Sequence, residues 1–112
     1  MTKMFASIIS LLFIAELTSL SAAVYKGQRV YVKECRGCHN GGQGLAASKR
    51  AREWKKMLNN DGEELAKVHT SSQKAEESWE YFKSSTFESN SRHLKDFLME
   101  YSKDSGKVPA CN

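Results

Sequence analysis

Apolar residues recur at helical spacing along this chain of 112 residues, and no stretch shows the alternation of a β-strand. Polar and glycine-rich segments interrupt the pattern at intervals, where helices are expected to end. Five helices are predicted: residues 24–34, 48–58, 61–69, 72–83 and 91 to about 106. The predicted fold class is therefore all-α.

The segments between these helices have distinct predicted roles. Residues 40–44 are read as a flexible turn, 59–62 as a helix break, and 84–90 as a polar loop anchored by Phe87. Ser48 and Ser91 are expected to cap the helices that follow them, and Asp61 is expected to open a capping box. Gly27 lies inside the first helix, where glycine costs about 1 kcal/mol relative to alanine. A close crossing with another helix would explain it.

The N-terminus has the pattern of a secretory leader. Lys3 precedes an apolar run over 4–15, and small residues favour cleavage after Ala23. The run is shorter than the ~20 residues that cross a bilayer, and Glu16 ends it, although a retained membrane anchor is the alternative. We expect residues 1–23 to be a signal peptide, residues 24–112 to form one domain, and the protein to be exported to the periplasm.

The composition sets limits on function. Lys and Arg number 17 against 13 Asp and Glu, a formal net charge of +4 that is too small and too mixed with acids to favour nucleic acid as a partner. A single domain of this size buries little apolar surface, and such domains commonly depend on disulfides, metals or cofactors. No set of residues resembles the acid, base or nucleophile of an enzyme, so none is predicted to be catalytic.

Cys35, Cys38 and His39 form a Cys-x-x-Cys-His motif, which is typical of c-type haem attachment. The two thiols can form thioethers to the porphyrin, and the imidazole can ligate the iron. A redox-active Cys-x-x-Cys would need flanking strands, and a zinc site would need further ligands at paired spacing. The remaining thiol and imidazole groups are Cys111, His69 and His93. The motif predicts one haem c, covalently bound through Cys35 and Cys38.

The chain resembles the class I cytochromes c. Gly27 and Tyr31, one helical turn apart before the haem motif, are similar to the opening of that family, and the apolar pattern of Leu94, Phe97 and Leu98 is similar to its closing helix. The resemblance implies a small all-α domain wrapped around one covalently attached haem, with the first and last helices crossing beside it. It also implies an exported monohaem carrier of single electrons rather than an enzyme.

The sixth ligand of the iron departs from the family pattern. The family usually supplies a methionine from the loop before the last helix, but residues 84–90 contain neither methionine nor histidine. His69 and His93 are the candidate metal ligands beside His39, with His69 slightly favoured. Met57 and Met99 lie in predicted helices and are interpreted as packing residues. An open sixth position is the alternative, and it would suit a haem-based ligand binder, sensor or weak peroxidase.

Two further features bear on partners. A basic face follows the haem motif, interpreted either as a solvated surface or as a docking patch for acidic redox proteins. Its residues are Lys49, Arg50, Arg52, Lys55 and Lys56. Cys111, the odd cysteine near the C-terminus, is expected on a mobile end, with a disulfide-linked dimer as the alternative. Membrane contact is expected only through partners or an uncleaved leader.

Overall fold

A computed structural model describes residues 22–109, and within that range every regular element is helical. The predicted all-α class is confirmed. Most of the predicted leader, and Cys111, lie outside the described residues. Helical residues 22–30 continue into η1 (Tyr31–Cys35) and α2 (Arg36–His39), and the later elements are α3 (Gly42–Ala46), α4 (Ala51–Thr70), η2 (Gln73–Ser78), α5 (Trp79–Phe82) and α6 (Ser85–Glu100).

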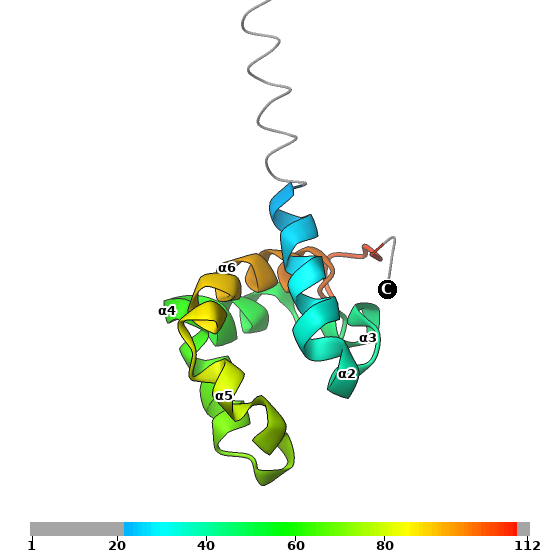
Figure 1. Cartoon of the computed structure of the whole chain (residues 1–112). Helices are drawn as coiled ribbons and strands as arrows, with labels where there is room; N and C mark the ends of the chain where they lie inside the picture. Colours follow the sequence, from blue (N-terminus) through cyan, green and yellow to red (C-terminus); the bar gives the residue numbers. More distant parts are fainter. Residues whose placement is uncertain (1–21, 110–112) are drawn as a thin grey trace, which may run out of the picture.

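The N-terminal helix crosses α6 at close range (Figure 1). A Cβ atom at Gly27 would overlap the backbone carbonyl of His93 and would stand 2.7 Å from the Cβ of Phe97. One turn later, the buried ring of Tyr31 packs against Phe97, with ring centroids 5.8 Å apart. The predicted crossing at Gly27 is therefore confirmed, and glycine is required there because any side chain would push the two helices apart.

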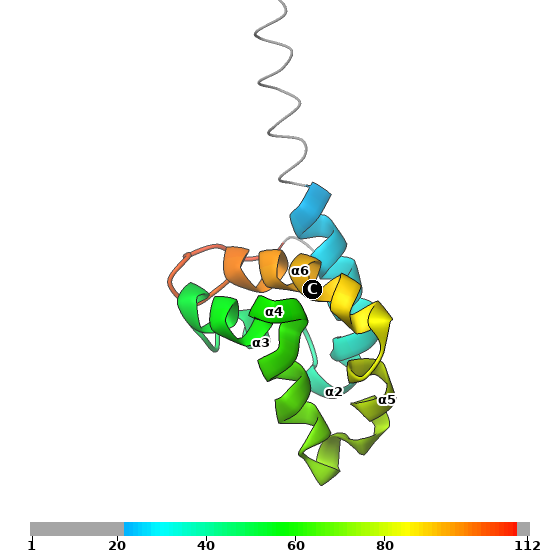
Figure 2. The ribbon, with the colours of Figure 1, turned by 90° about the vertical axis from the view of Figure 1, so that its left-hand side faces the viewer.

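A kink divides α4 where the sequence predicts a break. Residues 59–62 leave helical geometry, and Asn60, Asp61 and Gly62 all have positive φ. The first half of α4 packs along α6, and the second half turns away from it (Figure 2). A Cβ at Gly62 would stand 2.5 Å from the ring of Phe87, so both the backbone conformation and the packing require glycine. The predicted capping role of Asp61 is wrong, because an N-cap needs extended backbone.

The last helix begins earlier than the sequence suggests. The Ser84 hydroxyl accepts a hydrogen bond from the backbone N–H of Phe87 at 3.2 Å and so caps α6. Ser91, predicted to be that cap, is buried in the helix, and its hydroxyl donates to the carbonyl of Glu88. The predicted loop over 84–90 is wrong because Phe87, Ser91 and Leu94 share one helical face, so the polar residues between them form the exposed side.

The connection after the haem motif is also more ordered than predicted. Part of the expected turn at 40–44 belongs to α3, and the Ser48 hydroxyl donates to the carbonyl of Leu45 instead of capping α4. α4 begins at Ala51, whose backbone N–H donates to the carboxylate of Asp104 at 2.9 Å. The acceptor comes from the segment after α6, 53 residues further along the chain, so local sequence could not reveal it.

The segment predicted as a helix over 72–83 has two parts. η2 is a 3₁₀ helix, and α5 is a single α-helical turn. The indole N–H of Trp79 donates to the carbonyls of His69 at 2.8 Å and Ser72 at 3.0 Å, which ties α5 to the end of α4. α6 ends at Glu100, before the expected stop at Gly106. Among the described residues, no helix has the length and apolar character to span a membrane.

Candidate functional site

The Cys-x-x-Cys-His motif begins at the last residue of a π-helical turn. η1 spans Tyr31–Cys35, the motif continues through α2, and Asn40 then ends the helix with a positive φ of 62°. The Tyr31 hydroxyl donates to the carbonyl of Asn40 at 2.7 Å, so the buried residue at the helix crossing also fixes the end of the motif. Single π turns inside helices are frequent at functional sites. The end of the motif is thereby tied to the core through Tyr31.

The two cysteines are free thiols, with Cys35 half-buried and Cys38 exposed. Burial, reinforced by the charges of Glu34 and Cys38, raises the pKa of the Cys35 thiol to about 12. Redox-active Cys-x-x-Cys pairs need the opposite shift, because the thiolate is their nucleophile. The raised pKa and the absence of strands from residues 22–109 both count against a thioredoxin-like motif.

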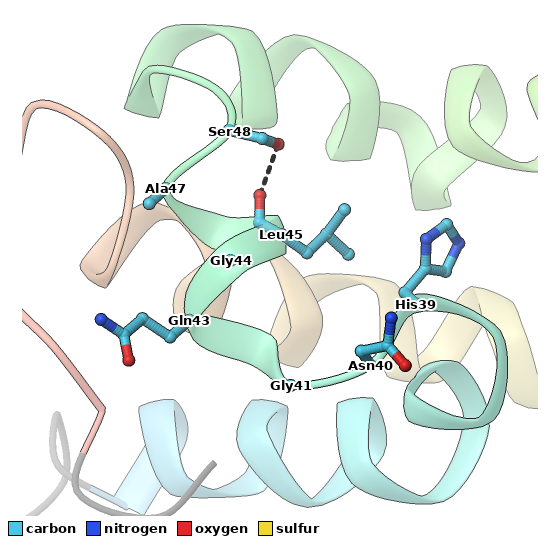
Figure 3. A pocket seen from close by; sticks show the side chains of 8 residues that line it. All are labelled: His39, Asn40, Gly41, Gln43, Gly44, Leu45, Ala47 and Ser48. Carbon is cyan, nitrogen blue, oxygen red and sulfur yellow. Dashed lines mark hydrogen bonds between the residues drawn. The ribbon is translucent and has the colours of Figure 1, made fainter.

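His39 closes the motif, and its imidazole projects away from the α2 backbone (Figure 3). His39 is exposed at the surface, but partial desolvation of its imidazole and the charge of the nearby His69 lower its pKa, which favours the neutral imidazole that binds metals. Beside His39, the segment from Asn40 to Ser48 surrounds an open hollow of about 620 Å³. This hollow is shallow, and most of the enclosed apolar space lies elsewhere.

Two adjoining cavities lie beside the motif, and they share Cys35, His39, Val68, His69 and Phe82. The first, of about 190 Å³, is almost wholly apolar, and its further lining residues are Tyr31, Leu45, Lys49, Trp54, Met57, Leu65, Leu94 and Leu98. The second, of about 480 Å³, has a more polar rim, and its further lining residues are Glu34, Cys38, Ser72, Lys74, Ala75, Glu77, Ser78 and Tyr81.

The cavities gather some of the predicted site residues and leave others out. Cys35, Cys38, His39 and His69 line the larger cavity, whereas His93 lines neither and stands at the crossing with Gly27. Met57 lines the smaller cavity, and Met99 packs against the core away from both. Among the large apolar residues of the later helices, Trp54 and Leu98 line the smaller cavity, whereas Trp79 and Phe97 lie outside both.

Several wall residues were missed by sequence reasoning. Leu65, Val68 and Phe82 enter the cavities from the second half of α4 and from α5. Leu65 and His69 are four residues apart on one helix, a spacing that puts them on the same face. That spacing pointed towards His69. The sequence predicted the break at 59–62 but not its direction, which aims this face at the motif.

The donor set fits a haem better than a bare ion. Within residues 22–109, no group of three or more His, Cys, Asp and Glu side chains is placed to hold a metal ion, so a zinc site has no support there. Two free thiols, two imidazoles and an apolar space instead match a cofactor that is itself large and apolar and that ligates iron at its centre. Cys35, Cys38 and His39 would hold it.

A helical domain whose terminal helices cross next to Cys-x-x-Cys-His, with an apolar cavity against the motif, has the architecture of a c-type cytochrome. The family model described as cytochrome C oxidase, cbb3-type, subunit III matches residues 22–88, more than half of the chain. The chain belongs to this family. The match contains the motif and the second half of α4 and stops early in α6. Comparison with curated proteins and with solved structures gives no match.

Proposed function

We propose that this protein is an exported monohaem c-type cytochrome that carries single electrons between redox partners. Family membership supports a haem-based electron carrier, and the observation that carries the proposal is the apolar cavity onto which Cys35 and His39 open. Cys35 and Cys38 would bind the haem covalently, and His39 would ligate its iron. When bound, the haem supplies one-electron chemistry between Fe(II) and Fe(III).

The protein's part is to hold this group in place and to limit the access of water. Trp54, Leu94 and Leu98 are all buried, and they form the dry wall of the smaller cavity. Val68, by contrast, is 52% exposed and lines the mouth of both cavities. One edge of the site therefore faces solvent, which allows electrons to pass to a docked protein without a substrate channel.

The proposed periplasmic location rests on the leader-like pattern over residues 1–23 and on the chemistry of the motif. Members of this family are typically exported or membrane-associated. The test is the N-terminal sequence of protein recovered from periplasmic extract. We expect a mature chain that begins at Val24, and full-length protein in the membrane fraction would instead indicate a retained anchor.

The basic face on the first half of α4 is the proposed docking surface for an acidic partner. Arg50, Arg52, Lys55 and Lys56 are exposed there, and Lys49 extends towards the smaller cavity, which it also lines. Opposite charges on two proteins raise their association rate, and salt screens that attraction. We therefore expect the rate of electron transfer to an acidic acceptor to fall as the salt concentration rises.

A charge-reversal pair locates this surface. The double substitution Lys55→Glu and Lys56→Glu should slow bimolecular electron transfer at low salt and remove most of its salt dependence. Lys26→Glu with Arg29→Glu is the matched control, because both residues are exposed on the N-terminal helix and the change in net charge is the same. Equal slowing by the two pairs would show that net charge, rather than this face, sets the rate.

Redox titration of the purified holoprotein tests the function directly. A carrier gives a reversible couple that follows a one-electron curve in both directions, monitored by its absorption spectrum. A curve that requires two electrons, or steady consumption of peroxide by the reduced protein at enzyme-like rates, would contradict the proposal. The second outcome would favour the alternative of a weak peroxidase.

A further inference from the structure

His69 stands next to His39 across the space that the two cavities share. The centroids of the two imidazoles are 6.0 Å apart, and their planes are inclined by 76°. Two imidazoles bound on opposite sides of one metal ion have centroids about 6 Å apart, because each metal–nitrogen bond is about 2 Å and each nitrogen lies roughly 1 Å from its ring centre. The spacing of the two rings is therefore compatible with one iron bound between them.

The orientation of the His69 ring is fixed by its own helix. Its Nδ1 lies 2.8 Å from the carbonyl of Leu65, the contact that a protonated Nδ1 makes as donor. In that tautomer Nε2 carries the free lone pair. Ligating histidines commonly have this arrangement, with the second ring nitrogen donating to a backbone carbonyl.

Two aromatic residues hold His69 from the other sides. The ring of Phe82 stacks on the imidazole, with centroids 4.0 Å apart and planes inclined by 20°. The indole N–H of Trp79 donates to the His69 carbonyl at 2.8 Å. Because the ring and the backbone are both positioned, little conformational entropy would be lost when the imidazole binds a metal.

The other candidate ligands lack this placement. His93 lines neither cavity, and its backbone carbonyl lies against Gly27 where the two helices cross. Met57 lines only the smaller cavity, and Met99 lines neither. His69 and His39 are the two imidazoles that line both cavities.

We propose that His69 is the second axial ligand of the haem iron, together with His39; this rests on the proposed haem attachment. The family usually supplies a methionine from the segment before the last helix. In this proposal an imidazole from the second half of α4 takes its place. Histidine in this position gives a lower potential than methionine and occupies the site that a small ligand would need. The protein is then a low-potential carrier with a closed sixth position, and the sensor and peroxidase alternatives lose their open site.

The test compares the holoprotein with two variants at the same position, His69→Ala and His69→Met. His93→Ala is the matched control, since His93 is also a half-buried histidine but lies outside the cavities. The probes are carbon monoxide added to the reduced protein, the spin state from absorption and electron paramagnetic resonance, and the midpoint potential. Protein labelled with ¹⁵N-histidine adds a count of the coordinated imidazoles by pulsed magnetic resonance, which needs no variant.

The wild type and His93→Ala should be low-spin, show two coordinated imidazoles and give no spectral change with carbon monoxide. His69→Ala should become high-spin and bind carbon monoxide rapidly, and His69→Met should raise the midpoint potential. One coordinated imidazole in the wild type, or a His69→Ala spectrum identical to that of the control, overturns the assignment. Protein with covalent haem and only one coordinated imidazole refutes this ligand alone, whereas protein without covalent haem refutes the proposed function as well.

Discussion

Replacing Gly27 by alanine sets two effects of opposite sign against each other. Helix propensity alone predicts that the change stabilises the protein by about 1 kcal/mol. The added Cβ, however, would overlap the carbonyl of His93 and stand 2.7 Å from the Cβ of Phe97, so two helix backbones must separate. Overpacking of this kind costs roughly 1–3 kcal/mol, and a clash with backbone belongs at the upper end because no side chain can rotate away. The expected net result is a loss of about 2 kcal/mol.

The assay is thermal or chemical unfolding of the holoprotein, followed by helical circular dichroism. For a domain of this size, a loss of about 2 kcal/mol lowers Tm by roughly 8–16 °C. Gly44→Ala is the matched control, because Gly44 also lies in a helix and nothing stands within 4 Å of its added Cβ. The control should be neutral or slightly stabilised. Equal stability of the two variants would refute the claim that the crossing requires glycine.

Two further changes test the packing and the charge around α4. Trp54→Phe removes the indole N–H that donates to the buried carbonyl of Ala46 at 2.9 Å. Unfolding experiments should show that the free energy of unfolding falls by about 1–3 kcal/mol. An unchanged Tm would mean that the carbonyl finds another donor. The pKa of Asp104 is lowered by hydrogen bonds from the Ala51 backbone N–H and the Ser102 hydroxyl. A lowered folded-state pKa contributes stability at neutral pH that is lost as the pH falls below about 4. Asp104→Asn should reduce the loss of stability at acidic pH, measured by unfolding experiments across a pH series. An unchanged loss would contradict the role assigned to Asp104.

Local pattern predicted the fold class and the main helix break but misplaced several helix ends. The break at 59–62 was readable because four consecutive residues there favour turns. The start of α6 could not be predicted in this way. Phe87 and Ser91 form part of its buried face through their packing against Gly62 of α4, a tertiary contact. The π turn at Tyr31–Cys35 and the link from Ala51 to Asp104 likewise depend on tertiary contacts.

The candidate site likewise has residues that the sequence predicted and residues whose placement depends on the fold. Cys35, Cys38 and His39 were predicted from spacing alone, since the chemistry of haem attachment fixes their separation. Register favoured His69 only slightly over His93, because both lie on helices at half-buried positions. The kink in α4 turns the face of Leu65 and His69 towards the motif, and this supports the proposal of His69.

Covalent attachment of haem is tested most directly by the mass of the mature polypeptide made in a cell equipped for cytochrome maturation. After denaturation and extraction with acid acetone, the wild type should keep the added mass of one haem and remain coloured. The double variant Cys35→Ser with Cys38→Ser should lose both. A wild-type chain that carries no haem after extraction would contradict the assignment of this protein as a c-type cytochrome electron carrier.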